Sequence, residues 1–313
     1  MATRLDRLSG WLYGQPSLLA AIAYAAWAIN IVLGRFVAGH IPPVMLSFLR
    51  WGLAFLIVLP FTWTHLRRDW PLIRRHLGLF TVLALTGTSA YNTMAYWGLQ
   101  YTQAINALLI QSTAPLLVAL WAFMLFGDRL STRQATGIAI SFVGVIAILS
   151  RGDIGVLGEI SFNRGDIWFF AALVVFAFYS ALVKTRPRIH PLSFLAFSMG
   201  WGALCLVPFL ILETASGRQT VLDATTALVL LYVAVLPSSV AYICYNRAIE
   251  LAGPNRVAAL YPLIVAFGAI LAIPLLGERP QLFHLLGCAL IFAGVIVATR
   301  NGRPTAVKEA VKE

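Results

Sequence analysis

Long apolar runs separated by short charged segments recur along the whole chain, and this pattern decides what the chain can fold into. A helix needs roughly 20 apolar residues to cross the hydrocarbon core of a bilayer. Of the 313 residues, 60% are hydrophobic and 11% are charged, which is more apolar surface than a soluble domain of this size can bury. We predict an all-α polytopic membrane protein with ten transmembrane helices, at about 17–36, 44–64, 77–98, 104–126, 134–150, 166–183, 192–212, 225–246, 255–276 and 282–299.

The formal net charge of the chain is +11, and the positions of the Lys and Arg residues indicate the membrane topology. If the N-terminus is cytosolic, the cytosolic segments hold 17 of the 23 Lys and Arg residues, as expected because positive charge stays on the cytosolic side during insertion. Both termini are therefore predicted to be cytosolic, with 301–313 as a polar cytosolic tail. No basic stripe interleaved with aromatic residues accompanies the charge. The expected partners are a lipid bilayer and a small-molecule substrate, and not nucleic acid.

Residues that carry enzymatic or metal chemistry are not grouped in this sequence. The three cysteines, Cys205, Cys244 and Cys288, fall inside apolar runs and form neither a disulfide framework nor a metal-ligand spacing. The sequence has no phosphate-binding loop, nucleophile elbow or zinc motif. We therefore expect no enzyme activity, no cofactor and no metal site.

The second half of the chain repeats the first. Residues 119–146 align with 269–296 without gaps at an offset of 150, so that Leu-Phe-Gly-Asp-Arg at 125–129 recurs as Leu-Leu-Gly-Glu-Arg at 275–279. The halves 1–150 and 151–300 then hold five spans each. Because five is odd, the two copies must cross the membrane in opposite directions. Inverted repeats place the substrate site near the bilayer midplane, and alternating access follows from their exchange of conformation.

Several segments match a known family. Gly98-Leu-Gln-Tyr-Thr-Gln-Ala-Ile-Asn-Ala through Pro115, Gly127-Asp-Arg-Leu, and Gly137 to Gly144-Val-Ile resemble the drug/metabolite transporter superfamily, and within it the EamA family. The second half repeats these segments as Ala248-Ile-Glu-Leu-Ala-Gly-Pro-Asn, Gly277-Glu-Arg-Pro, and Gly287 to Gly294-Val-Ile. The resemblance implies a carrier of the bacterial cytoplasmic (inner) membrane whose central cavity is lined by helices 1, 3, 4, 6, 8 and 9, with helices 5 and 10 at the periphery.

One branch of that family, the YddG-like exporters of aromatic amino acids, is similar in part. Its members carry a proline in helix 4 after an aromatic and polar stretch. Here Pro115 follows Gln111-Ser-Thr-Ala, which contains no aromatic residue, and the proline expected in helix 9 is replaced by Val265, with Pro262 displaced.

Polar and aromatic residues within the predicted spans are the candidate substrate-binding residues. They recur at three- and four-residue intervals and so share helix faces. They are Tyr24, Trp27, Asn30, Ser89, Asn92, Tyr96, Gln111, Ser112, Tyr179, Ser180, Tyr242, Asn246 and Tyr261. Aromatic rings and neutral amides suit a zwitterion with an apolar or aromatic side chain. The alternative is that these groups only form hydrogen bonds between helices.

Prolines and glycines within the spans have two interpretations each. Pro115, Pro237 and Pro262 are candidate hinges because a proline inside a helix leaves a carbonyl without its donor; they can equally be packing kinks. Glycines seven residues apart in helices 5 and 10 predict close helix packing, within a monomer or in a weak homodimer.

Titratable residues inside the spans are scarce. The acidic residues lie near span ends, so no carboxylate deep in a span is available to couple transport to protons, which favours facilitated export. Arg50 is the one cation well inside a predicted span. It can reach toward a cavity or a carbonyl, or it can bind a substrate carboxylate.

These features favour a transporter that exports small metabolites, most of all aromatic or other apolar amino acids, through a central cavity. A multidrug or organic-cation exporter of the same superfamily is the first alternative, and the missing membrane carboxylate counts against it. An intramembrane enzyme is the second, and it would need a cluster of His, Asp or Cys at one membrane face.

Overall fold

Helices make up the architecture of the protein. The computed structural model describes residues 11–36, 40–102, 104–150, 153, 155–158, 163–218, 220–221, 223–276 and 281–299. The tail at 301–313 and both chain ends lie outside these residues, as do the side chains of 269 and 271–280, which include part of the second repeat motif. Among the described residues the structure contains helices and no β-strand.

The helical segments follow one another with short connections. In chain order they are α2 (Pro16–Phe36), α3 (Pro43–Arg75), α4 (Leu77–Ala84), η1 (Leu85–Ser89), α5 (Ala90–Leu99), α6 (Ala104–Gln111), α7 (Ala114–Phe126), α8 (Thr132–Leu149), α9 (Gly155–Gly158), α10 (Arg164–Leu182), η2 (Val183–Thr185), α11 (Pro191–Ala215), α12 (Ala224–Val233), η3 (Ala234–Val240), α13 (Ala241–Ala252), α14 (Pro254–Ala258), α15 (Leu263–Leu276) and α16 (Leu282–Thr299).

Each of the ten predicted ranges is occupied by helix. Seven helical stretches of the described residues are long and apolar enough to cross a membrane, and Pro16–Ile31 is a shorter apolar helix. The helix predicted at 44–64 continues to Arg75, because the charged residues that end the apolar run do not end the helix. The chain is therefore an all-helical, multi-pass membrane protein.

Four helical stretches are interrupted, at matched positions in the two halves. The π-helical turn η1 separates α4 from α5, and the π-helical turn η3, which contains Pro237, separates α12 from α13. Pro115 is the second residue of α7, after a break at 112–113, and Pro262 lies in the turn before α15. Since π-turns interrupt helices mostly at functional positions, these stretches are where a site is to be sought.

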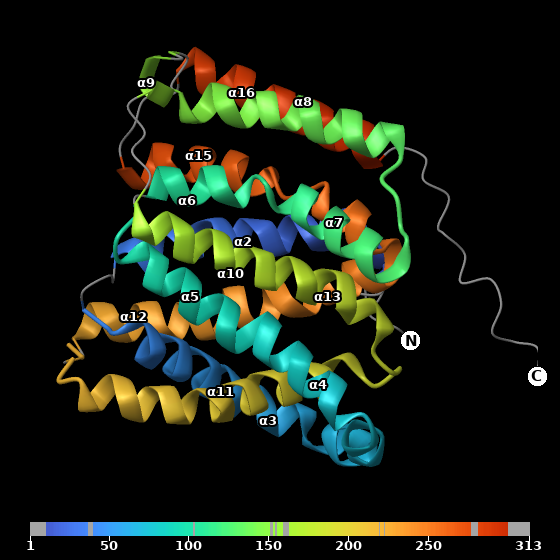
Figure 1. Cartoon of the computed structure of the whole chain (residues 1–313), viewed down its shortest axis with the longest axis vertical. Helices are drawn as coiled ribbons and strands as arrows, with labels where there is room; N and C mark the ends of the chain where they lie inside the picture. The colour runs from blue at the N-terminus through green and yellow to red at the C-terminus, as the bar shows by residue number, and fades with distance from the viewer. Residues whose placement is uncertain are drawn as a thin grey trace, which may run out of the picture.

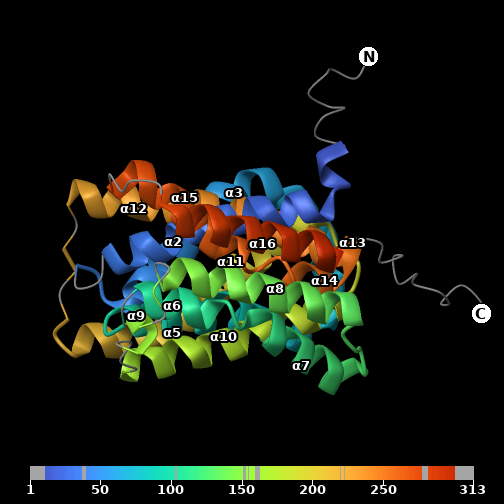
Figure 2. The ribbon, with the colours of Figure 1, turned by 90° about the horizontal axis from the view of Figure 1, so that it is seen from above.

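Corresponding helices of the two halves pack side by side in opposite directions. α3 lies along α11 with Val44 near Glu213 at one end and Asp69 near His190 at the other. α8 lies along α16, and this pair forms one edge of the molecule while α3 and α11 lie toward the opposite edge (Figure 1). The view from above shows α8 and α16 running together along their length (Figure 2). Helices α2, α5, α10 and α13 fill the middle.

Glycines bring α8 and α16 into backbone contact. A Cβ added at Gly137 would lie 2.5 Å from the Gly294 carbonyl oxygen, and one added at Gly144 would lie 2.6 Å from the Gly287 carbonyl oxygen. The predicted close packing is thus made within one chain, where small residues let two backbones approach.

Glu213 and Asp166, two acidic residues near span ends, are buried. The Glu213 carboxylate accepts hydrogen bonds from the Val44 and Met45 backbone N–H groups at 3.1 and 2.8 Å, which caps the start of α3. The Asp166 carboxylate accepts hydrogen bonds from Thr102 and from the Asn163 N–H at the start of α10. Each carboxylate satisfies helix-terminal N–H groups that have no intrahelical partner, which is a structural role.

We expect acidification to destabilise the end of the molecule where α3 meets α11. The rings of His65 and His190 stack with centroids 3.7 Å apart, and His190 Nδ1 accepts the Leu192 N–H at the start of α11. Partial burial, and then His65, lower the pKa of His190 below its ordinary value. Below about pH 6.5 the unfolded chain then binds more protons than the folded protein. The free energy of unfolding therefore decreases as the pH is lowered.

The measurement is the melting temperature of the purified protein between about pH 8 and pH 5.5. A His190→Asn variant, whose amide can still cap α11, is expected to melt with a smaller dependence on pH than the wild type. Equal pH dependence in the two proteins would contradict this role of His190.

Candidate functional site

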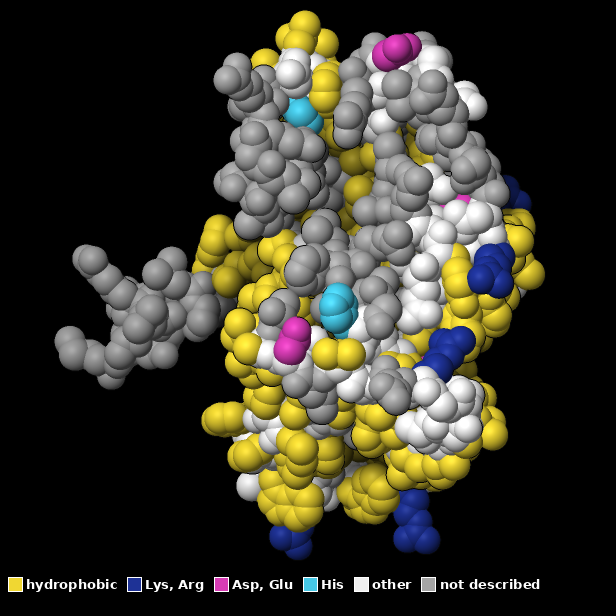
Figure 3. All heavy atoms as spheres, turned by 90° about the vertical axis from the view of Figure 1, so that its left-hand side faces the viewer, with side chains coloured by type: hydrophobic (Ala, Val, Ile, Leu, Met, Phe, Trp, Pro, Cys, Tyr) yellow, Lys and Arg dark blue, Asp and Glu magenta, His cyan; other side chains and the backbone are white. Residues whose placement is uncertain are grey.

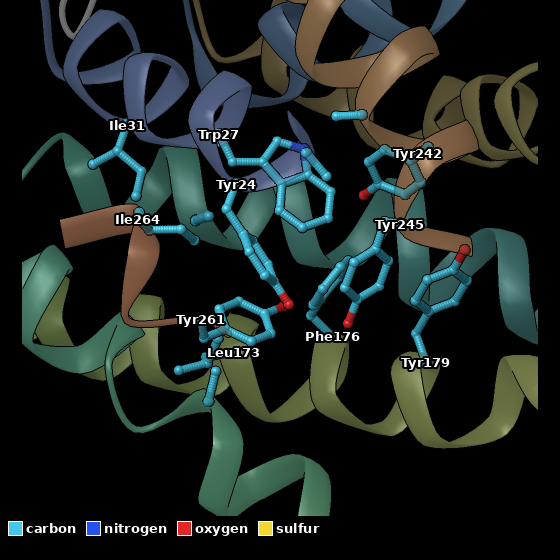
Figure 4. Packing of buried hydrophobic residues seen from close by; sticks show 14 of the residues in the cluster. Tyr24, Trp27, Ile31, Leu173, Phe176, Tyr179, Tyr242, Tyr245, Tyr261 and Ile264 are labelled. Atoms are coloured by element: carbon cyan, nitrogen blue, oxygen red, sulfur yellow. The ribbon is translucent and has the colours of Figure 1, made fainter. Parts of the chain in front are cut away.

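Seven aromatic residues meet in the middle of the molecule. This aromatic cluster consists of Tyr24, Trp27, Phe176, Tyr179, Tyr242, Tyr245 and Tyr261, all 8% exposed or less. Their rings come from α2, α10, α13 and the turn before α15, and they point toward one another (Figure 4). Trp27 has four ring neighbours at centroid distances of 5.0–5.8 Å. The neighbouring rings pack mostly edge-to-face or tilted, arrangements favoured by their quadrupoles.

Hydrogen bonds fix the polar tips of these rings. Tyr24 Oη donates to the Val257 carbonyl oxygen and Trp27 Nε1 donates to the Pro237 carbonyl oxygen, both at 2.8 Å. Tyr179 Oη donates to Asn246 Oδ1 at 2.6 Å. Pro237 has no N–H to bond the carbonyl one turn earlier, and Ser238 Oγ donates to the Val233 oxygen there at 2.6 Å.

Arg50 lies beside the aromatic cluster and is 1% exposed. Its guanidinium donates to Ser238 Oγ at 2.6 Å, Asn92 Oδ1 at 2.8 Å and Tyr96 Oη at 2.7 Å. Asn30 Oδ1 lies 3.4 Å from Nη1 and accepts the Tyr96 hydroxyl proton at 3.1 Å. Arg50 therefore joins α2, α3 and α5 of the first half to η3 of the second half.

A cavity of about 990 Å³ opens at the end of the molecule where α7, α10 and α13 end. We call it the basic vestibule, since its lining includes Arg129, Lys184, Arg186, Arg188, Arg247 and Arg256 against the acidic residues Asp128 and Glu250. Lys184 pairs with Asp128, and Arg186 and Arg247 pair with Glu250. The excess of cations gives the vestibule a positive potential, which attracts anions.

The Tyr179–Asn246 hydrogen bond lies at the end of the aromatic cluster nearest the vestibule. Val183 and Glu250, which line the vestibule, follow Tyr179 and Asn246 by four residues on α10–η2 and α13, about one helical turn. The inner end of the vestibule is thus about one helical turn from the Tyr179 ring of the cluster.

The opposite end of the molecule has a different surface. Figure 3 views that end and shows a few charged side chains scattered among hydrophobic ones. A cavity of about 540 Å³ on this side is lined by Ile110, Asn163, Arg164, Asp166, Ile167 and Phe170. The Asp166 carboxylate there is already engaged in the cap of α10.

The structure brings most of the candidate residues together in two adjacent groups. Tyr24, Trp27, Tyr179, Tyr242 and Tyr261 belong to the aromatic cluster, whereas Asn30, Asn92 and Tyr96 surround Arg50. Asn246 and Ser180 bind the tyrosine hydroxyls of the cluster, since Ser180 Oγ lies 2.7 Å from Tyr245 Oη. Tyr242 Oη donates to the Gly87 carbonyl oxygen in η1, which ties α13 to the π-turn of the other half.

Three candidates lie elsewhere. Ser89 Oγ donates to the Gly202 carbonyl oxygen of α11 at 2.7 Å, so it serves helix packing. Ser112 Oγ bonds the Leu109 carbonyl oxygen at the break between α6 and α7, and Gln111 is buried beside it. The sequence prediction omitted Tyr245, although it follows Tyr242 by three residues and shares its helix face, and it interpreted the vestibule arginines only as a topology signal.

Known proteins resemble this chain over most of its length. The EamA-like transporter family matches residues 15–150 and again 163–300. An uncharacterized transporter from Archaeoglobus fulgidus is 28% identical over 285 residues, which cover 90% of this chain and 96% of the relative. A probable amino-acid metabolite efflux pump from Salmonella typhimurium is 27% identical over 298 residues, covering 90% and 94%.

Two further similarities are to a relative whose name states a function and to a solved structure with a similar fold. A probable terminal-alkyne amino-acid exporter from Streptantibioticus cattleyicolor is 29% identical over 229 residues, covering 72% of this chain and 74% of the relative. A solved crystal structure superposes with a TM-score of 0.72 over 91% of this chain and 96% of that chain, at 19% identity. The second likeness is one of fold.

Proposed function

We propose that this chain, which belongs to the EamA-like transporter family, exports amino acids with aromatic or other apolar side chains by alternating access. The chain is a membrane transporter, and its family and relatives are transporters rather than enzymes by name. The observation that carries the substrate class is the buried aromatic cluster beside a wide basic vestibule. The vestibule attracts a carboxylate, and the rings accept an apolar side chain.

Relatives and charge support an amino acid over an organic cation. Two relatives are named as an amino-acid metabolite efflux pump and an amino-acid exporter. A vestibule rich in arginine disfavours entry of a cation. We therefore rank a multidrug or organic-cation exporter below an amino-acid exporter.

The membrane arrangement that we propose has ten spans in two inverted five-span repeats, 1–150 and 151–300. The antiparallel packing of α3 with α11 and of α8 with α16, the matched π-turns η1 and η3, and the double match to one family support it. The basic vestibule then faces the cytosol in a bacterial inner membrane, with both termini and the tail at 301–313 on that side. The glycine faces of α8 and α16 pack against each other within the chain, which supports a monomer as the transporting unit.

Transport in this arrangement starts from a vestibule that is open to the cytosol and a centre that is closed. A substrate enters the vestibule, the Tyr179–Asn246 hydrogen bond opens, and the rings separate around the substrate. Pro115, Pro237 and Pro262 lie at helix interruptions and act as the hinges at which half-helices turn. The two halves then exchange conformations and release the substrate outside.

Counterflow in proteoliposomes tests this function. Vesicles loaded with unlabelled L-phenylalanine and diluted into labelled L-phenylalanine are expected to accumulate label, and a protonophore is expected to leave the initial rate unchanged, because the buried carboxylates have structural roles. Protein-free vesicles are the control. Absence of counterflow with every amino acid tried would contradict the substrate class, and its loss on adding the protonophore would contradict facilitated transport.

A further inference from the structure

Arg50 carries a buried charge that has no acidic partner among the described residues. No carboxylate of those residues lies within 4 Å of the guanidinium, and the ion pairs that they form all lie at the basic vestibule. Charged groups inside a membrane protein are costly, are nearly always paired, and mark substrate pathways. An arginine that bonds only neutral oxygens is therefore a candidate binding group for an anionic ligand.

The bonding of the guanidinium leaves room for that anion. A guanidinium has five N–H donors in a fixed plane. Nε and Nη1 make the three shortest bonds, to Ser238, Asn92 and Tyr96. For Nη2, the acceptor recorded among the described residues is the Pro237 carbonyl oxygen at 3.4 Å. Nη2 thus retains donor capacity, which a carboxylate oxygen can use in a charge-assisted hydrogen bond.

The Nη2 group of Arg50, which retains donor capacity, lies beside the aromatic cluster. The Pro237 carbonyl oxygen lies near Arg50 Nη2 and also accepts Trp27 Nε1 at 2.8 Å, so the cation and the indole meet at one carbonyl. The Trp51 ring lies 4.8 Å from the guanidinium carbon, and it contacts Tyr242 of the cluster at 5.2 Å. A cation next to a cluster of rings matches a molecule with a carboxylate next to an apolar side chain.

We infer that Arg50 is the carboxylate-binding residue of a central subsite, which takes small monocarboxylates with an aromatic or other apolar side chain. The inference rests on the proposed function and names the group that the site recognises. The carboxylate replaces Pro237 at Nη2, while the side chain enters between the rings around Trp27. Recognition lies in the carboxylate, so the substrate ammonium group contributes less.

A purely structural role makes a different prediction. If Arg50 only ties η3 to α2 and α5, its loss weakens folding and lowers the binding of all ligands together. If it binds the substrate, its loss weakens the binding of carboxylates alone.

Three probes with the same phenyl ring separate these outcomes: L-phenylalanine, 3-phenylpropanoate, which lacks the ammonium group, and phenethylamine, which lacks the carboxylate. Binding is measured from the rise in melting temperature of the detergent-solubilised protein with probe concentration. The wild type is expected to bind both carboxylates and to bind phenethylamine at least about tenfold more weakly.

In Arg50→Gln, affinity for the two carboxylates is expected to fall roughly 10- to 100-fold, because a charge-assisted hydrogen bond is lost, while phenethylamine binding stays the same. Arg50→Lys keeps the charge without the planar fork and is expected to be intermediate. Ser239→Ala is the matched control, since it removes a buried hydroxyl of the same π-turn that donates to the Ala234 carbonyl oxygen at 3.0 Å, and it is expected to keep the preference for carboxylates.

Each remaining outcome overturns a stated claim. If Arg50→Gln binds L-phenylalanine within about twofold of the wild type, or loses all three probes equally, the Arg50 subsite is refuted. If the wild type binds 3-phenylpropanoate in an Arg50-dependent manner but carries no amino acid in counterflow, the subsite stands and amino-acid export is refuted. A wild type that binds none of the probes and carries no amino acid refutes both.

Discussion

Trp27→Ala protein is expected to lose nearly all transport and to be strongly destabilised. The indole packs against Tyr24, Phe176, Tyr242 and Tyr245 and donates to the Pro237 carbonyl oxygen. Truncation leaves a cavity at the junction of α2, α10, α13 and η3, and for a buried tryptophan the cost is about 3–5 kcal/mol. In the proposed mechanism the same truncation removes the largest ring that contacts the substrate.

The measurement combines counterflow with size-exclusion chromatography of the solubilised protein. Trp70→Ala is the matched control: Trp70 lies on α3 and is 44% exposed, so its loss is expected to leave transport and elution profile close to those of the wild type. Trp27→Phe keeps a ring but loses the N–H donor, and is expected to fold and to transport at a reduced rate. Full transport by Trp27→Ala would show that the cluster is packing and not a substrate path.

Adding one methyl group at Gly144 or Gly137 is expected to force α8 and α16 apart. The new Cβ at Gly144 would lie 2.6 Å from the Gly287 carbonyl oxygen and 2.9 Å from the Ile291 backbone nitrogen. Neither backbone atom can move without shifting its helix. Overpacking of this kind typically costs about 1–3 kcal/mol, and the combined Gly137→Ala and Gly144→Ala variant is expected to lose more than either alone.

Gly52→Ala provides the control, because a Cβ at Gly52, on α3, meets nothing within 4 Å. It is expected to melt at or slightly above the wild-type temperature, since alanine favours a helix over glycine. The melting temperature of each variant in detergent checks the comparison. If Gly144→Ala melts like Gly52→Ala, the two helices do not touch through their glycines.

Helix positions and faces were accessible from the sequence. Helix occupies each predicted range because apolar length and the need to satisfy backbone hydrogen bonds in lipid act on the local chain. Tyr24 and Trp27 share a face because the helical period is 3.6 residues. The glycine faces of α8 and α16 were likewise predicted, since small residues at regular spacing indicate close packing.

Contacts between helices could not be predicted from the sequence in the same way. Ser89 has the spacing of a pore residue but donates to the Gly202 carbonyl oxygen of α11, because Ser89 lies within the π-turn η1, where the residues depart from the regular helical period. The rings predicted to line a cavity pack against one another, while the larger of the two cavities described lies among arginines at one end.

The sequence by itself thus determined that this chain is a helical membrane protein with a repeated unit and polar faces inside its helices. Tertiary structure alone decided that Arg50 meets Asn92 and Tyr96 of α5 and Ser238 of η3, and that no acid of the described residues joins them. The physical reason is that hydropathy and helical period act along the chain, whereas the partners of a buried charge depend on how helices are rotated and where π-turns offset them.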